Sequence, residues 1–221
     1  LGIITAATLK LYPYPDQSTT ALVALRDLHA SISFLEQAQS GSGGTLCSFE
    51  LMPRIGLEFA CRHVAGCSDP MAAPHEWYVL LSLQASGDAI NVELLLSRIL
   101  ETAFDAGEIT DAVIASSEQQ AQSLWKLREG LVEGQRFEGA SIKHDVSVPV
   151  SKVPEFIDRA CATVVRRVPG IRPCPFGHVG DGNIHFNLSQ PVEMDGQSFL
   201  ALWDEVNHLV HDQVSELGGS F

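Results

Sequence analysis

The sequence predicts an α+β domain in which helices cover a largely antiparallel sheet. Segments with the alternation of strands and segments with the apolar periodicity of amphipathic helices follow one another along the chain. The helical segments are long enough to cover a sheet, and a glycine-rich reversal at 180–183 joins two extended segments as a hairpin does. With 221 residues, the chain is long enough to build a core without disulfides.

The first half of the chain opens with apolar and β-branched residues that predict a strand over 2–11, followed by a short linker over 16–19. A Ser-Gly-Ser-Gly-Gly break at 40–44 ends the first predicted helix. Pro53 is suited to the start of the second helix. The elements expected after the linker are strand 21–25, helix 28–39, strand 45–51, helix 53–63, strand 76–84 and helix 90–106.

The second half continues the same alternation. Pro169 and Gly170 form a good helix stop, and Gly218 and Gly219 form another. Between them, two extended segments fill 171–188. The remaining elements expected here are strand 111–115, helix 118–137, strand 140–150, helix 153–168 and a final helix 198–217.

Charge and cysteine content exclude several classes of protein. The chain has 27 acidic and 14 basic side chains, a net charge of −13, which argues against nucleic acid and against anionic membrane surfaces as partners. No apolar run approaches the ~20 residues of a transmembrane helix. Five dispersed cysteines, an odd number, predict a reduced intracellular protein. The cytoplasm is the first expectation, with a peripheral membrane or mitochondrial matrix location left open. Cys61, His63 and Cys67 make at most part of a zinc site.

Arg128 breaks the apolar pattern of its helix. Leu124, Trp125, Leu131 and Val132 lie three and four residues away on either side, so Arg128 falls within the apolar stripe. A guanidinium there needs an anion, because an unpaired buried charge is costly. The anion is either an acidic neighbour in a structural salt bridge or the carboxylate of a substrate, unless the side chain reaches out to solvent.

The strand at 140–148 has two unlike faces. Its apolar face includes His144, which is interpreted as a packed and hydrogen-bonded core histidine rather than a ligand. Its polar face includes Lys143 and Asp145, and it borders either solvent or a polar pocket.

The glycine-rich segment 176–187 is the third unusual place. The reversal can fold His178 and His185 back toward each other, and alternation places His185 and Asn187 on one face. Two neutral imidazoles suit a divalent ion such as Zn²⁺, Mn²⁺ or Fe²⁺, although a third ligand is still needed. The alternative is a hairpin with two incidental histidines.

Four stretches together resemble a known family. They are 2–11, Trp-Lys-Leu-Arg-Glu at 125–129, Ala-Ser-Ile-Lys-His-Asp at 140–145 with Val-Pro at 148–149, and the glycine-histidine segment at 177–187. Their order and spacing resemble the C-terminal domain of FAD-linked oxidases that act on D-2-hydroxy acids, such as lactate, glycolate and 2-hydroxyglutarate. That resemblance implies a ferredoxin-like α/β sandwich.

The resemblance also implies which parts of the enzyme lie in this chain and which lie outside it. An N-terminal FAD-binding domain is expected to precede Leu1, with 1–15 as its tail and linker and 16–221 as the substrate- and metal-binding domain. The chain has no initiator methionine, which also suggests a piece of something longer. The third metal ligand and the catalytic base are expected beyond Phe221. This piece is therefore expected to hold no flavin and to be inactive alone. A homodimer stays open.

Within the chain, the resemblance assigns roles to five residues. Arg128, Lys143 and Asn187 would hold a small 2-hydroxy acid, and His178 and His185 would bind the divalent metal. Val132 departs from the family pattern, because members with dicarboxylic substrates tend to carry a hydroxyl residue there. The alternatives are a stand-alone metal- or anion-binding module without redox chemistry and, less favoured, an interaction subunit.

Overall fold

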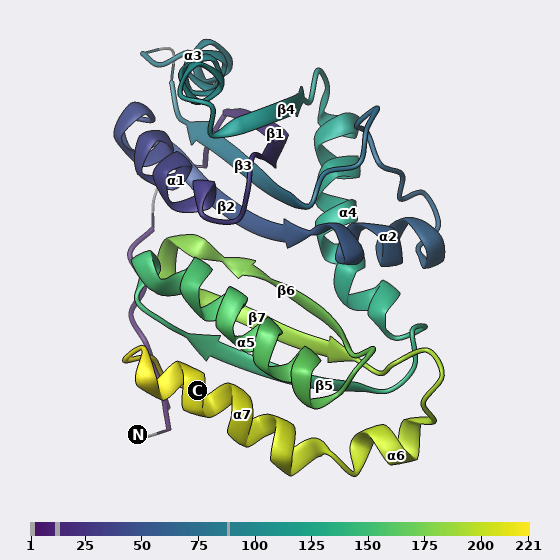
Figure 1. Cartoon of the computed structure of the whole chain (residues 1–221). Helices are drawn as coiled ribbons and strands as arrows, with labels where there is room; N and C mark the ends of the chain where they lie inside the picture. Colours follow the sequence, from purple (N-terminus) through teal and green to yellow (C-terminus); the bar gives the residue numbers. More distant parts are fainter. Residues whose placement is uncertain (1–2, 12–13, 88) are drawn as a thin grey trace.

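The computed structural model describes residues 3–11, 14–87 and 89–221. A seven-stranded sheet runs through it in the order β4-β1-β3-β2-β6-β7-β5, and every neighbouring pair is antiparallel (Figure 1). The fold class predicted from the sequence is therefore confirmed. The strands are β1 (Gln17–Leu25), β2 (Leu46–Pro53), β3 (Trp77–Ala85), β4 (Ile109–Ile114), β5 (Ser141–Ser147), β6 (Arg172–His178) and β7 (Asn183–Ser189).

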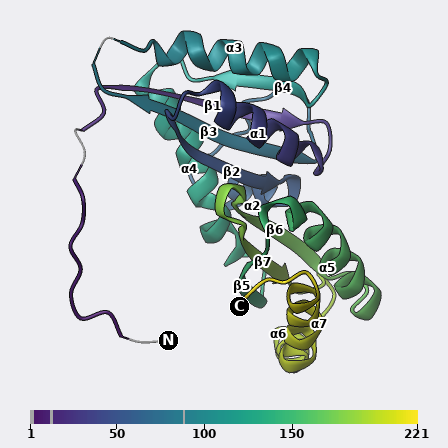
Figure 2. The same cartoon turned by 90° about the vertical axis from the view of Figure 1, so that its left-hand side faces the viewer.

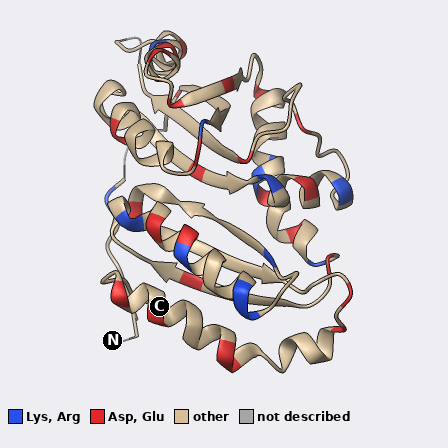
Figure 3. Ribbon diagram, in the orientation of Figure 1, with Lys and Arg blue, Asp and Glu red and all other residues tan. Residues whose placement is uncertain are grey.

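Helices pack on both faces of the sheet, each over its own apolar core. Apolar residues of α1, α3, α5 and α7 join one core, and those of α2 and α4 join the other (Figure 2). Charged residues lie on the helices α3, α5 and α7, as expected for solvent-facing helix surfaces (Figure 3). The helices are α1 (Ala30–Gly41), α2 (Arg54–His63), α3 (Val92–Asp105), α4 (Glu118–Gln135), α5 (Val153–Arg167), α6 (Gly196–Leu200) and α7 (Trp203–Glu216), with 3₁₀ turns η1 (Val150–Lys152) and η2 (Val179–Asp181).

No helix in these described ranges has the length and apolar character needed to cross a membrane.

Helix α4, which carries Arg128, is fixed by its start and by its glycines. Ser117 caps it, accepting a hydrogen bond from the backbone N–H of Gln120. Farther along, α4 crosses α2 so closely that a Cβ on Gly134 would lie 2.6 Å from the backbone carbonyl of Phe59. A glycine is therefore required at this crossing.

The sheet has a seam at its centre. Strands β2 and β6 pair through only Glu50↔His178 and Leu51↔Gly177, whereas the other neighbouring strands share five or more pairs. Figure 1 shows the two halves diverging from this short contact, with β4, β1, β3 and β2 in one half and β6, β7 and β5 in the other. The seam leaves strand edges free on both sides of the contact.

The predicted first strand is wrong. Residues 3–11 form no strand, and their side chains are exposed, 93% for Ile3 and 86% for Ile4. Gly2, where the prediction began, lies outside the described residues. A β-branched sequence alone cannot make a strand, because its N–H and C=O groups need a neighbouring strand to pair with. Most of the predicted linker 16–19 belongs instead to β1, which begins at Gln17 and pairs with Ala85.

The predicted final helix 198–217 is two helices. Helix α6 begins earlier, at Gly196, where Asp195 caps it, and the chain breaks at 201–202 before α7. Phe199 and Val206 are fully buried on either side of the break, but Trp203 is 41% exposed. Both helices contribute to the same core, to which Phe199 of α6 and Val206 of α7 belong.

Candidate functional site

The half-sheet β6-β7-β5 presents a polar row on the face shared with α4. The hairpin between β6 and β7 turns through η2, where Gly182 has a φ of +75°. A Cβ at this glycine would also lie 1.9 Å from the carbonyl oxygen of Val148. Residues directly opposite on antiparallel strands project to the same face. The resulting cross-strand rows are Phe176–His185–Asp145 and Cys174–Asn187–Lys143.

These rows and α4 enclose a cavity of about 350 Å³. The structure therefore brings together Arg128, Lys143, His185 and Asn187, four of the five residues singled out from the sequence. The polar face of the predicted strand 140–148 borders this pocket. The lining residues are Arg128, Val132, Lys143, His144, Asp145, Phe176, His185 and Asn187.

Arg128 forms a salt bridge with Glu50 of β2. Its Nε and Nη2 lie 3.1 and 2.9 Å from Glu50 Oε2, and both side chains are nearly buried, 11% and 6% exposed. The guanidinium also lies 4.9 Å from the ring centre of Phe176. The acidic neighbour considered from the sequence is thus present. Arg128 Nη1 has no hydrogen-bond partner among the described residues.

Glu50 was missed in the sequence. The available signal was a lone charge in the apolar run Phe49-Glu50-Leu51-Met52 of β2. A carboxylate in a buried strand needs partners, as an arginine in an apolar helix stripe does. Glu50 Oε1 lies 2.6 Å from Nδ1 of His178, so one carboxylate binds two of the residues singled out.

His178 is half exposed and lies beside the cavity of Arg128 rather than in it. It lines a neighbouring cavity of about 360 Å³ together with Glu50 and Asp181. Its ring centre is 6.2 Å from that of His185, with the rings nearly perpendicular. The hairpin therefore folds the two imidazoles toward each other, as the glycine-rich reversal predicts.

His185 carries the second carboxylate contact. Its Nδ1 lies 3.4 Å from Asp145 Oδ1, whose side chain is 69% exposed. Burial lowers the pKa of His185, with Asp145 opposing this effect and Arg128 adding to it. Lowering the pKa favours the neutral imidazole, which is the form that accepts a proton or binds a metal.

The two imidazoles fit part of a divalent metal site. Each has a carboxylate beside Nδ1, and neither Nε2 has a hydrogen-bond partner in the described part of the chain. Metal-binding histidines commonly have this arrangement, with the second ring nitrogen bonded to a carboxylate. Two ligands are fewer than such ions require. Among the described residues, no group of three or more His, Cys, Asp or Glu side chains is placed to hold a metal. Cys61, His63 and Cys67 therefore form no such group either.

The other predicted residues are placed as follows. Lys143 is exposed at the cavity, and no described residue forms an ion pair or hydrogen bond with it. Asn187 is 5% exposed and donates through Nδ2 to Gln135 Oε1 at 2.8 Å. His144 is a core histidine, as predicted, since it is 4% exposed and its Nδ1 bonds to the carbonyl of Phe186 at 2.9 Å.

Curated relatives of this chain include D-2-hydroxyglutarate dehydrogenases. D-2-hydroxyglutarate dehydrogenase of Xanthomonas citri pv. viticola is 33% identical over 100% of this chain and 45% of its own length. The enzyme of the same name from Stutzerimonas stutzeri is 32% identical over 100% of this chain and 46% of its own length. This chain thus spans less than half the length of these relatives.

Solved structures share the fold at low identity. p-Cresol methylhydroxylase with substrate bound superposes with a TM-score of 0.63 and 13% identity, covering 94% of this chain and 45% of that one. 4-Ethylphenol oxidase from Gulosibacter chungangensis gives a TM-score of 0.59 and 12% identity, covering 96% and 46%. The family model for FAD linked oxidases, C-terminal domain, matches residues 14–221. The chain therefore belongs to the FAD-linked oxidase family, whose C-terminal domain it matches over nearly its whole length.

Proposed function

We propose that this chain is the substrate-binding part of an FAD-dependent dehydrogenase that oxidises a D-2-hydroxy acid. One observation carries the proposal: Arg128, Lys143, His185 and Asn187 come from three separate elements and line one cavity. Family membership and the names of the curated relatives support the same reaction class.

The cavity supplies cationic and polar groups suited to a small acid. Lys143 is the cation with no described partner there, so its ammonium can take a substrate carboxylate. Arg128 is already paired with Glu50 but retains Nη1 as a donor. Asn187 donates to Gln135 through Nδ2 and not through its amide oxygen. That oxygen can therefore accept a hydrogen bond from a substrate hydroxyl.

FAD, which we assign to the N-terminal domain expected before residue 16, would accept the hydride from C2, and a base would take the proton of the hydroxyl, so that the hydroxy acid becomes an oxo acid. A divalent ion on His178 and His185 would supply Lewis acidity to the substrate hydroxyl. In this proposal the described residues bind and orient the acid, and they place the neutral His185 beside it.

D-2-Hydroxyglutarate is the first substrate to test, because it is named for the relatives at 33% and 32% identity. Val132 lines the cavity and has no hydroxyl to offer a second carboxylate. D-lactate and glycolate are therefore tested beside it.

The experiment uses the protein encoded by the complete gene, assayed with each acid and an artificial electron acceptor. Lys143→Met should lower kcat/KM by about 10- to 100-fold, because a charged hydrogen bond contributes about 1.5–3 kcal/mol. Lys152→Met is the matched control, since Lys152 lies outside the cavity and pairs with Glu155. A flavin-loaded protein that turns over none of the three acids would refute the proposal. Binding without turnover would favour the non-redox module.

A further inference from the structure

Glu50 and His178 face each other at the seam of the sheet. They form one of the two residue pairs that join β2 to β6, so their side chains project side by side from the same face. Helix α4 brings Arg128, 78 residues from Glu50 in the sequence, to the same point. Two segments that are distant in the sequence, β6 and α4, therefore contact one carboxylate on β2.

The two oxygens of Glu50 serve different partners. Oε1 contacts His178 Nδ1 at 2.6 Å, and Oε2 accepts from Nε and Nη2 of Arg128. An ionised carboxylate only accepts hydrogen bonds, so the hydrogen between Glu50 and His178 belongs to Nδ1. In a neutral imidazole the other nitrogen, Nε2, then carries the lone pair.

We propose that Glu50 is a positioning residue that holds His178 as its Nδ1–H tautomer and fixes the guanidinium of Arg128 beside it. The tautomer leaves Nε2 of His178 able to bind a metal ion or accept a proton. The salt bridge directs Nε–H and one Nη2–H of Arg128 at Glu50 and leaves Nη1 and the second hydrogen of Nη2 as donors. The consequence for catalysis rests on the proposed function, but the tautomer itself does not.

His185 provides an internal contrast. Its carboxylate neighbour, Asp145, is 3.4 Å away and 69% exposed, whereas Glu50 is 2.6 Å from His178 and 6% exposed. A short contact in a buried setting orients a ring far more strongly than a long one in water. The inference therefore concerns Glu50 and does not extend to Asp145.

The test reads the tautomer directly by ¹⁵N NMR of the full 221-residue chain with labelled histidine, at mildly alkaline pH. His178→Asn assigns the signals by their loss. In the wild type we expect a protonated Nδ1 and an unprotonated Nε2. Glu50→Gln should shift His178 toward the Nε2–H form, because the amide no longer demands a hydrogen at Nδ1.

Glu138→Gln is the matched control. Glu138 is also a nearly buried carboxylate that accepts from arginine and histidine, but its partner Arg172 lies at the opposite end of β6 from His178. It should lower stability and leave the tautomer unchanged. A purely structural role for Glu50 would give this same result in Glu50→Gln, and that outcome would overturn the proposal.

A second readout is Zn²⁺ affinity, measured by competition with a chromogenic chelator. Glu50→Gln should weaken it about 10- to 100-fold, the usual cost of losing a carboxylate behind a metal-binding histidine. If Glu50→Gln fails to fold, the wild-type spectrum still decides, because an Nε2–H tautomer there refutes the inference. A wild type with the expected tautomer but no Zn²⁺ binding would refute the metal part of the proposed function and leave the role of Glu50 intact.

Discussion

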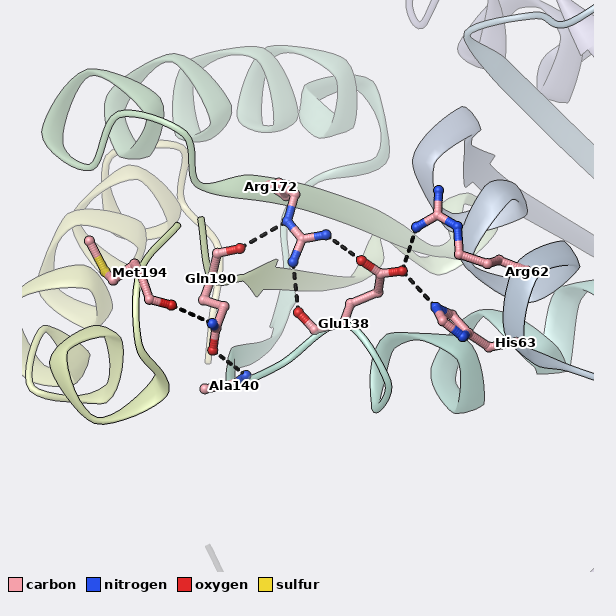
Figure 4. Close-up of polar contacts among 7 residues, drawn as sticks. All are labelled: Arg62, His63, Glu138, Ala140, Arg172, Gln190 and Met194. Atoms are coloured by element: carbon pink, nitrogen blue, oxygen red, sulfur yellow. Dashed lines mark hydrogen bonds and ion pairs between the residues drawn. The ribbon is translucent and has the colours of Figure 1, made fainter. Parts of the chain in front are cut away.

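Replacing Glu138 by glutamine should destabilise the fold by about 2–3 kcal/mol. The Glu138 carboxylate, 9% exposed, lies between α4 and β5 and links these elements to α2 and β6 (Figure 4). It accepts from Arg62 Nη1 at 2.6 Å, from His63 Nε2 at 2.7 Å, and from Arg172 Nη1. Arg172 also bonds to the backbone carbonyls of Glu138 and Gln190, which the substitution leaves in place.

The size of this effect follows from the exposure of the three donors. Arg62 is 56% exposed, so its pair contributes only about 0–1 kcal/mol. Arg172 and His63 are 18% and 23% exposed, and a hydrogen bond to a charged group such as this carboxylate contributes about 1.5–3 kcal/mol. The glutamine oxygen keeps one of these two bonds. The remaining loss of about 2–3 kcal/mol corresponds to a fall in Tm of about 4–12 °C for a domain of this length.

The loss should depend on pH in a defined direction. Burial alone would raise the pKa of Glu138, but the hydrogen bonds from His63, Arg172 and Arg62 outweigh it and lower the pKa. A carboxyl with a lowered pKa in the folded state stabilises the protein above its unfolded pKa and loses this contribution as pH falls through the folded value.

Urea unfolding at several pH values therefore checks the reasoning. The difference between wild type and Glu138→Gln should be full near neutral pH and should shrink in acid below about pH 4.5, the region of the unfolded pKa. Glu155→Gln is the control, because Glu155 pairs with Lys152 and Arg159 on an exposed helix surface. Equal stability of Glu138→Gln and wild type at neutral pH, or a difference that grows in acid, would refute the argument.

Three further substitutions or reagents test other parts of the structure. Gly134→Ala should cost about 1–3 kcal/mol, because the new Cβ meets the Phe59 backbone at 2.6 Å and outweighs the ~1 kcal/mol gain in helix propensity. Gly180→Ala, with nothing within 4 Å, should be near neutral, and equal urea midpoints for the two would contradict the close crossing. Gln135→Leu removes the acceptor for Asn187 but also a buried Nε2 with no described partner, so unfolding should show a net loss of only about 1 kcal/mol. Cys47 is exposed, whereas burial raises the pKa of Cys174 to about 12, so alkylation followed by mass spectrometry should label Cys47 first. Labelling of Cys174 at the same rate in the folded protein would show that its burial is wrong.

Local patterns in the sequence predict the parts of the site that lie within one element. Alternation along 184–188 places His185 and Asn187 together, and the glycines predict the turn that brings His178 back. Alternation also places His144 in the core. Each of these predictions needs only the geometry of one strand or one hairpin, and the structure agrees with all three.

Local patterns in the sequence do not select interaction partners that lie far apart along the chain. Arg128 clearly needed an anion, but no local rule selects Glu50, 78 residues away, over the other acidic residues. The same limit explains the failed first strand, because residues 3–11 have strand-like side chains and no partner strand. The break before Trp203 was missed as well, since no glycine or proline marks it in the sequence.

The cavity that His178 lines lies where it does because the pairing between β2 and β6 is short. A continuous β2–β6 ladder would bring the strands within about 5 Å of each other along their whole length and leave no room between them. Pairing stops after two residue pairs, so the strands diverge on either side of Glu50 and His178. The cavity beside His178, lined by β2 and η2, lies at this divergence. At the point where the halves meet, the buried carboxylate of Glu50 bonds to Arg128 and His178, which adds a side-chain link between β2 and β6. Lengthening the ladder would add strand pairing but close the space beside His178, so this second cavity, next to the one that Arg128 lines, depends on the short pairing.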